Sequence, residues 1–284
     1  MSLAPLRRRR VSAYCAGAGL GEAIAACRRL AAHGLAATIG YSPPPGERPR
    51  AVADVHLAAF DRLAAEQLDS HISVKLSGLG FDAQLFEELD AAAARSGHPL
   101  HVDALAPETA EETWRVLESA PRAARVGTTL PGRWHRSVED VALAAELGLR
   151  VRVVKGQWPD VPANGLDPRA GFLKVLDRLR GHEHGVAVAT HDVPLLAESL
   201  RRLRNAATPC TVELYLGLPF RAPALTARRL GVPIRVYVAY GHSGAPYSGA
   251  DLRRNPAAAW WLVQDLLLGK DKAWLSIRRS SGRG

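Results

Sequence analysis

The segment RVRVVKGQW, from Arg150 to Trp158, is one of eight short segments rich in β-branched and apolar residues. Each is followed by a polar or glycine-containing turn and then by a stretch whose apolar residues recur at steps of three and four, as in an amphipathic helix. This pattern predicts strands that alternate with helices. The other segments are LAATIGYS (35–42), HISVKLSGLG (71–80), PLHVDAL (99–105), ARVGTTLPG (124–132), GVAVATHD (185–192), CTVELYLGL (210–218) and IRVYVAYG (234–241).

Strands that alternate with helices must pair in parallel, and parallel sheets are covered by helices. Eight such units close into a (β/α)8 barrel, and 284 residues is the usual size of one domain of this kind. An open doubly wound sheet is the alternative, but no GxGxxG follows the first predicted strand, where that fold carries its dinucleotide-binding motif. We therefore expect an α/β fold with one (β/α)8 barrel over residues 11–275.

The ends of the chain carry much of its formal charge of +9. Four arginines occupy residues 7–10, and the last residues are rich in Ser, Gly and Arg, so we expect disordered tails at 1–10 and 276–284. Elsewhere, basic residues alternate with acidic ones in stretches such as DVHLAAFDRLAAEQLD, which is typical of a solvated helix face. No nucleic-acid partner is expected.

Cys15, Cys27 and Cys210 have neither a CxxC arrangement nor the spacing of metal ligands, and we interpret them as buried thiols in a reducing cytosol. No metal site is expected. No apolar run reaches the roughly 18 residues of a membrane-spanning helix, and the first residues reverse the order of a secretory signal. These features predict a cytoplasmic protein without an integral membrane segment.

Charged and hydroxyl side chains concentrate within or just after the predicted strands. In a (β/α)8 barrel the functional residues lie at the carboxyl ends of the strands, so these side chains are candidates for one site. Each of these residues alone also has a structural explanation: a strand lysine can face a helix, a tyrosine can belong to the core, and THD can form a helix N-cap. Such explanations do not account for so many polar residues at the strand ends. The candidates are Lys75, Asp103, Arg152, Lys155, Thr190, His191, Asp192, Glu213, Tyr215, Tyr237 and Tyr240.

Four segments carry a resemblance to a known family: ISVKLSGLG, VRVVKGQW, VAVATHD and IRVYVAYG followed by PY. In this order they resemble the proline dehydrogenase family, over roughly residues 36–256. The family fold is a distorted (β/α)8 barrel that holds FAD noncovalently. The resemblance implies that a hydride passes from a carbon next to nitrogen in the substrate to N5 of the flavin.

The resemblance also assigns residues to the cofactor. Arg152 and Lys155 match the basic residues of the family motif VRLVKGAY, which contact the flavin and its phosphates, and Gly156 adjoins them. A fixed guanidinium and ammonium suit this role because a reduced flavin and a pyrophosphate both carry negative charge. The other residues assigned to the cofactor are Trp158, in place of a tyrosine near the flavin ring, Thr190 and His191, which match the ATH turn, and Glu213.

The substrate-side residues match the family only in part. Lys75 and Asp103 match residues of the second and third strands, while Tyr237 and Tyr247 match two tyrosines that shape the substrate pocket. The resemblance thus implies that Lys75, Asp103 and Tyr237 position the substrate for reaction. At the fourth strand, however, the family's LQAYL is replaced by LPGRW.

The largest departure follows the eighth strand. The family pattern PYxxRRxxE, whose two arginines bind the proline carboxylate, reads PYSGADLRRNP here, with Ala250 and Asp251 at the arginine positions. Free proline should therefore bind poorly. Arg253 and Arg254 lie three residues further on and could bind a longer or displaced acid. Alternatively, the pocket takes a neutral or cationic amine, or a carrier-bound acyl group, with Asp251 paired to its nitrogen.

A changed substrate is the favoured interpretation, because the flavin-side residues are largely kept while the substrate-side residues differ. The expected function is FAD-dependent oxidation of a C–N bond in a small amine, imino acid or hydrazine-like molecule other than free proline. The electron acceptor is expected to be a quinone or oxygen. The alternative is a noncatalytic barrel that binds a small molecule or a partner protein on the same scaffold.

Overall fold

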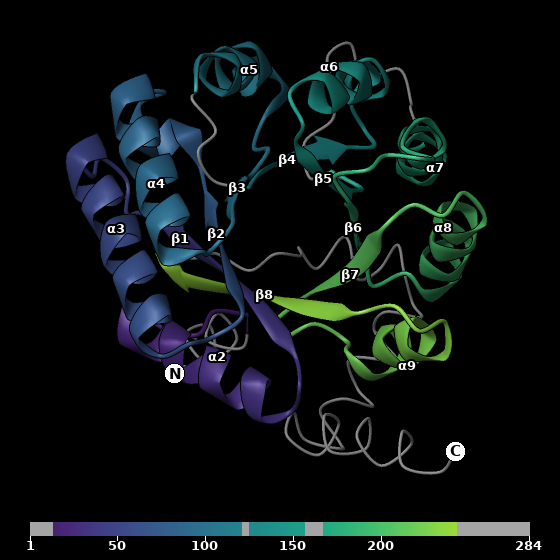
Figure 1. Ribbon diagram of the computed structural model, residues 1–284, viewed down its shortest axis with the longest axis horizontal. Helices are drawn as coiled ribbons and strands as arrows, with labels where there is room; N and C mark the ends of the chain where they lie inside the picture. The colour runs from purple at the N-terminus through teal and green to yellow at the C-terminus, as the bar shows by residue number, and fades with distance from the viewer. Residues whose placement is uncertain (1–13, 121–124, 157–166, 243–284) are drawn as a thin grey trace, which may run out of the picture.

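The protein folds as the closed barrel of eight parallel strands that the sequence predicts, in a computed structural model that describes residues 14–120, 125–156 and 167–242. Neighbouring strands pair in chain order, and the last strand closes the barrel against the first (Figure 1). This closure excludes the open doubly wound sheet. The strands are β1 (Ala36–Ser42), β2 (Ser70–Val74), β3 (Leu100–Val102), β4 (Val126–Pro131), β5 (Arg150–Val154), β6 (Val186–Ala189), β7 (Cys210–Tyr215) and β8 (Ile234–Gly241).

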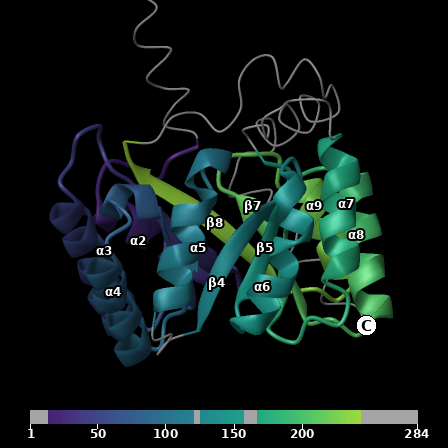
Figure 2. The same cartoon turned by 90° about the horizontal axis from the view of Figure 1, so that it is seen from above.

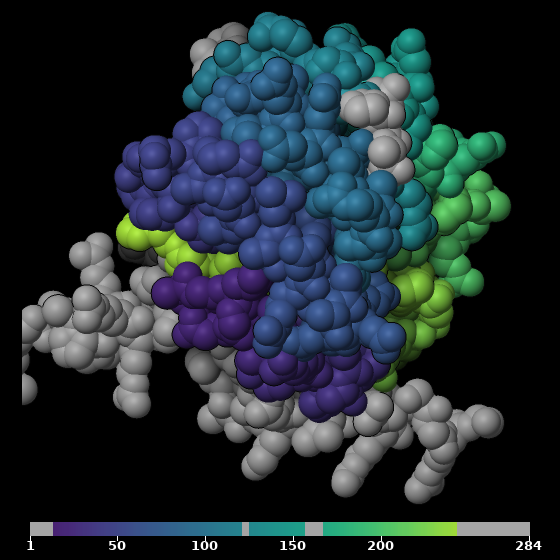
Figure 3. Space-filling view, turned by 60° about the vertical axis from the view of Figure 1, so that its left-hand side comes forward, coloured from purple at the N-terminus to yellow at the C-terminus, as the bar shows by residue number. Residues whose placement is uncertain are grey.

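Helices cover the outside of the barrel (Figure 2). Figure 3 shows the violet and blue helices α2 to α4 packed side by side on one flank. Three short 3-10 helices, η1 (Leu76–Leu79), η2 (Pro107–Thr109) and η3 (His135–Val138), lie among them. The α-helices are α2 (Leu20–Ala32), α3 (Pro49–Ala65), α4 (Ala83–Ser96), α5 (Ala110–Ser119), α6 (Asp140–Glu146), α7 (Pro168–Arg178), α8 (Val193–Asn205) and α9 (Arg221–Arg229).

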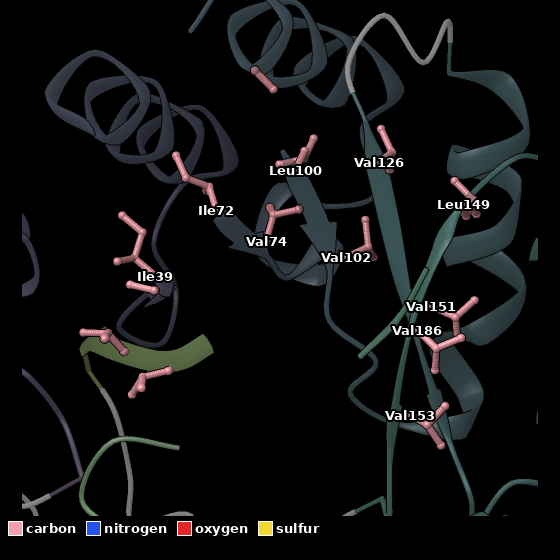
Figure 4. Close-up of a cluster of buried hydrophobic side chains, with 14 of the residues drawn as sticks. Ile39, Ile72, Val74, Leu100, Val102, Val126, Leu149, Val151, Val153 and Val186 are labelled. Carbon is pink, nitrogen blue, oxygen red and sulfur yellow. The ribbon is translucent and has the colours of Figure 1, made fainter. Parts of the chain in front are cut away.

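Alternation along the strands separates an apolar layer from a polar barrel interior. On β5, Val151 and Val153 are fully buried and point toward the helices (Figure 4), so the intervening Arg152 faces inward. Arg152 bonds to Glu213 of β7 and to Asp103, the residue after β3. Neither strand is a neighbour of β5, so these bonds cross the interior. Branched apolar residues usually fill such an interior. Here buried charged groups take their place.

The length of β2 and the burial of the cysteines differ from the sequence-based expectation. The segment 71–80 was expected to be extended, but β2 ends at Val74 and η1 follows, because the Gly78 N–H donates to the Lys75 carbonyl and turns the chain out of the sheet. Of the cysteines, only Cys27 is buried, while Cys15 and Cys210 are half-buried. The predicted tails, 1–10 and 276–284, lie outside the described residues.

The start of α8 confirms that THD forms a helix N-cap. The Asp192 carboxylate accepts a hydrogen bond from the Leu195 N–H at 3.0 Å, and Pro occupies the first turn. Such a cap contributes about 1 kcal/mol. Among the described residues, no helix has both the length and the apolar composition needed to cross a membrane.

Two glycines in helices allow a test of how tightly the helical layer packs. A Cβ on Gly171 of α7 would lie 1.8 Å from the carbonyl oxygen of Gly132, whereas one on Gly21 of α2 would meet nothing within 4 Å. Gly171→Ala should therefore lower the free energy of unfolding by about 1 to 3 kcal/mol. Gly21→Ala should leave it unchanged or raise it by up to about 1 kcal/mol. Urea denaturation measures both values, and equal effects would contradict this packing.

Candidate active site

The guanidinium of Arg152 lies in the barrel interior between two carboxylates. Its Nε and Nη2 donate to the two oxygens of Glu213 at 2.9 and 2.8 Å, and Nη1 donates to Asp103 at 2.6 Å and to Ser73 at 3.3 Å. Burial by itself opposes the charged form, but Glu213 and Asp103 outweigh it and hold the pKa of Arg152 above its ordinary value. Arg152 is therefore a permanent cation with four of its five N–H groups engaged.

Asp103 is the second centre of this network. Its carboxylate accepts hydrogen bonds from Ser73 at 2.6 Å and from the Tyr237 hydroxyl at 2.7 Å, and the Lys75 ammonium lies 3.7 Å away. Burial alone would raise the pKa of Asp103, but the charges of Arg152 and Lys75 outweigh it and leave the pKa below its ordinary value. Hydrogen bonds from Ser73 and Tyr237 lower it further. Asp103 is therefore an anion at neutral pH.

Tyr237 connects this network to an aromatic wall. Its ring lies 5.3 Å from the guanidinium carbon of Arg152 and stacks on Tyr215 with ring centroids 5.3 Å apart. Burial first, and then the negative charge of Asp103, raise the pKa of Tyr237 well above its ordinary value, so the hydroxyl keeps its proton and acts as a donor. The small residue Gly40 makes room for it, because a Cβ there would lie 2.1 Å from the Tyr237 hydroxyl.

Five of the sequence-predicted residues thus meet in one network: Lys75, Asp103, Arg152, Glu213 and Tyr237. Tyr240 does not join it. Its ring packs against Tyr41 with centroids 5.3 Å apart, and its hydroxyl is buried without a partner among the described residues. The expectation that Tyr240 lies in the site is therefore wrong, because successive strand residues point to opposite faces.

A second cluster lies beyond the ends of β5 and β6. The Lys155 ammonium donates to Asp192 at 2.9 Å, and Arg169 reaches the same carboxylate at 3.1 Å. Gly156, with a φ of +88°, holds the chain close to β4, since a Cβ there would lie 2.9 Å from the Pro131 Cβ. The cluster has two cations and one anion, so it carries a net positive charge at the mouth of the barrel.

Arg133 joins this second cluster, although the sequence motifs did not assign it to the cofactor. Its backbone N–H donates to the Lys155 carbonyl at 3.1 Å, and its Nε is buried with no hydrogen-bond partner among the described residues. A buried donor without an acceptor costs free energy unless a further group supplies one. In the sequence, the feature that pointed to Arg133 is the replacement of a family tyrosine by arginine in LPGRW.

Thr190 and His191 lie at the end of β6, and the contacts of both are internal. His191 Nδ1 lies 2.8 Å from the Pro219 carbonyl and Nε2 lies 2.9 Å from the Tyr215 nitrogen, so Nδ1 donates and Nε2 accepts. The Thr190 hydroxyl accepts from the Asp192 N–H at 3.2 Å. His191 therefore connects the end of β6 to the end of β7 and to the loop that follows β7, and it offers only its ring surface to a ligand.

Other predicted residues cannot be placed. They lie outside the described residues and are Trp158, Tyr247, Asp251, Arg253 and Arg254.

No model of a protein family matches this chain. Two curated proteins named Proline dehydrogenase 1, one from Bacillus subtilis subsp. natto and one from Bacillus subtilis strain 168, are each 26% identical to it over 276 residues. Each match covers 89% of this chain and 89% of the relative. They confirm the resemblance to proline dehydrogenase that the motifs predict.

Solved structures support the fold. Proline utilization A (PutA) from Bdellovibrio bacteriovorus, inactivated by N-propargylglycine, matches 96% of this chain with a TM-score of 0.71 at 16% identity. PutA from Corynebacterium freiburgense matches 97% with a TM-score of 0.68 at 17% identity. This chain covers 34% and 33% of those longer proteins. At this level of identity the likeness establishes the (β/α)8 fold.

The role of His191 can be tested through the pH dependence of stability. Burial, above all, lowers the pKa of His191 from 6.5 to about 4. Between these values the unfolded chain binds a proton that the folded protein does not, so the folded protein loses stability as the pH falls. The difference in free energy of unfolding between wild type and His191→Gln should therefore shrink by about 3 kcal/mol from pH 7 to pH 4. Urea titrations measure it; a constant difference would contradict a buried neutral ring.

Proposed function

We propose that this protein is an FAD-dependent dehydrogenase that oxidises a C–N bond in a small amine other than free proline. The observation that carries the proposal is the network of Arg152, Asp103, Tyr237 and Lys75 at the carboxyl ends of the strands, where (β/α)8 enzymes have their active sites. It lies in a chain similar over 89% of its length to proteins named Proline dehydrogenase 1.

The second cluster fits an anionic cofactor. The buried Nε of Arg133 lacks an acceptor among the described residues, and Lys155 and Arg169 share the single carboxylate of Asp192. Lys155 and Arg169 both contact Asp192, the N-cap of α8, where the helix dipole also favours negative charge. Arg133, Lys155 and Arg169 would hold the pyrophosphate of FAD, and the first network would face its ring system.

When bound, the flavin would supply the acceptor for one hydride, which carries the two electrons of the oxidation. The chain's own residues then have to bind and orient the amine. The Asp103 carboxylate stays ionised and can accept an N–H of the substrate, while Tyr237 and Lys75 fix its orientation. Hydride loss needs a free lone pair on nitrogen, so the substrate reacts as the neutral amine. A strong general base is not required.

The balance of charge argues against free proline as the substrate. In the first network, the two cations, Arg152 and Lys75, are matched by the two anions, Asp103 and Glu213, so its net charge is zero. A buried carboxylate would find no surplus positive charge there. The two residues at the family's arginine positions, Ala250 and Asp251, supply none either. A neutral or esterified amine has no carboxylate, so it needs neither a surplus positive charge in the network nor the missing arginine pair.

Cofactor binding is tested first. The purified protein should be yellow, and a reductant should bleach its flavin band. Lys155→Gln should weaken FAD binding by about ten- to a hundredfold, because a hydrogen bond to a charged group is lost. Lys174→Gln, on the exposed face of α7, removes the same charge and should leave the affinity unchanged. A colourless protein that takes up no added FAD would instead support a noncatalytic barrel.

Substrate choice is tested by anaerobic mixing. Breaking a buried charge pair costs about 3 to 5 kcal/mol, which is about a hundredfold to several thousandfold in affinity. L-Proline should therefore reduce the flavin far more slowly than its methyl ester or N-substituted amines do. The double variant Ala250→Arg with Asp251→Arg should react faster with L-proline than the wild type. Rapid bleaching of the wild type by L-proline would disprove a changed substrate.

A further inference from the structure

A cavity of about 600 Å³ opens at the end of the barrel opposite to the candidate active site. Its lining comes from the first residues of the strands and the turns before them, including Ser70, Pro99, Arg125, Arg150 and Arg235. Because all strands are parallel, these residues lie at the amino ends, while Lys75 and Asp103 follow the carboxyl ends. We refer to this space as the amino-end cavity.

The described lining of the amino-end cavity has a surplus of positive charge. Its charged side chains are Arg125, Arg150, Arg235 and Asp69, which gives a net charge of +2. Only Arg235 is neutralised, through an ion pair with Asp69 at 2.9 Å. In the described part of the chain, no carboxylate lies within 4.0 Å of Arg125 or Arg150.

Arg150 is held in place by neutral rings in the barrel interior. Its Nη1 donates to His71 Nε2 at 3.0 Å, and its Nη2 lies 3.5 Å from His101 Nδ1. His101 Nε2 lies 2.9 Å from the Thr129 hydroxyl, which itself donates to a backbone carbonyl, so Nε2 carries the ring proton and Nδ1 is an acceptor. Both rings therefore act as acceptors and provide no negative charge.

The electrostatics of these groups agree with an uncompensated cation. Burial, above all, lowers the pKa of Arg150 to about 10, although Glu213 opposes the shift. The pKa of His71 falls well below its ordinary value because of burial and then Arg150, and that of His101 because of burial and then Arg152. The histidines stay neutral at physiological pH, and the described residues provide no ion-pair partner for the guanidinium beside them.

We propose that the amino-end cavity binds a small phosphate-bearing anion through Arg150 and Arg125. A phosphate dianion matches the net charge of +2, and planar guanidinium groups bind phosphate oxygens in a bidentate way. The volume lies within the range of small-molecule sites, so the cavity has room for a ligand larger than an inorganic ion. His71 and His101 hold the Arg150 side chain in position for this contact.

The competing explanation is that these residues only stabilise the barrel, as residues at the amino ends of its strands commonly do. In that case phosphate would bind no better than chloride, and Arg125→Gln would not change the affinity for phosphate. If the anion site exists, bound phosphate should raise the midpoint of thermal unfolding, and the variants should lose this increase.

The test is calorimetric titration of the purified protein with inorganic phosphate, pyrophosphate and glycerol 3-phosphate, in chloride buffer of matched ionic strength. Arg125→Gln and Arg150→Gln should each weaken binding at least about tenfold. Arg201→Gln is the matched control, because this exposed arginine of α8 pairs only with the surface residue Glu198 in the described structure. Its affinity should equal that of the wild type.

A second control separates this cavity from the mouth at the carboxyl ends. Lys155 belongs to the cluster proposed to hold the FAD pyrophosphate, so Lys155→Gln reports phosphate that binds at that mouth instead. Loss of binding in Lys155→Gln with retention in Arg125→Gln would place the anion at the other mouth and overturn the proposal. Absence of binding of all three probes to the wild type would also overturn it. If Arg150→Gln does not fold, Arg125→Gln decides, because Arg125 is exposed.

The three probes distinguish two sources of the same chemistry. Equal affinity for inorganic phosphate and glycerol 3-phosphate would identify free phosphate as the ligand, and tighter binding of the organic ester would identify a phosphorylated metabolite. Either result supports the anion site. The proposal does not depend on the redox function, because in the described structure its residues have no hydrogen bond or ion pair with the second cluster of Arg133, Lys155 and Arg169.

Discussion

The buried guanidinium of Arg152 must be neutralised inside the barrel, and this requirement fixes the side chains around it. Glu213 on β7 and Asp103, directly after β3, provide the two carboxylates, at 2.8 and 2.6 Å. Removing one partner of such a buried pair commonly costs about 3 to 5 kcal/mol, because a charge is left without compensation. The pairs therefore set which residues of three separate strands face each other across the interior.

The polar interior has a different charge balance at its two ends. Arg150 and Arg152 lie two residues apart on β5 and so point to the same side of the strand. Arg152 has two carboxylates, whereas Arg150 has two neutral imidazoles. The network around Arg152 is consequently balanced, and the lining of the amino-end cavity keeps a positive surplus. The positive charge of Arg152 also lowers the pKa of Arg150. Nearby anions offset this repulsion between the two guanidinium groups.

The two clusters at the carboxyl end divide the chemical tasks of the proposed enzyme. The balanced network around Asp103 suits a small amine, because it can accept an N–H without adding net charge. The cationic cluster around Lys155 and Arg133 suits phosphate groups, since one buried donor there has no partner in the described residues. In the proposed function, this arrangement would bring a neutral substrate and an anionic cofactor together within one mouth of the barrel.

The sequence by itself determined the eight strands, their parallel order and the apolar layer under the helices. Periodicity is a local property, and residues such as Val151 and Val153 reveal it directly. The motifs also identified Lys75, Asp103, Arg152, Glu213 and Tyr237 as candidates for one site, because parallel strands bring their carboxyl ends together.

Only the tertiary structure decided how these side chains are paired and which of them face the interior. It placed Tyr240 away from the network, joined Arg133 to Lys155, and left Arg150 among histidines without a carboxylate in the described residues. A one-residue step along a strand reverses the direction of a side chain, and the partner of a buried charge comes from a strand distant in sequence. Neither property can be derived from periodicity, because both depend on the register in which the barrel closes.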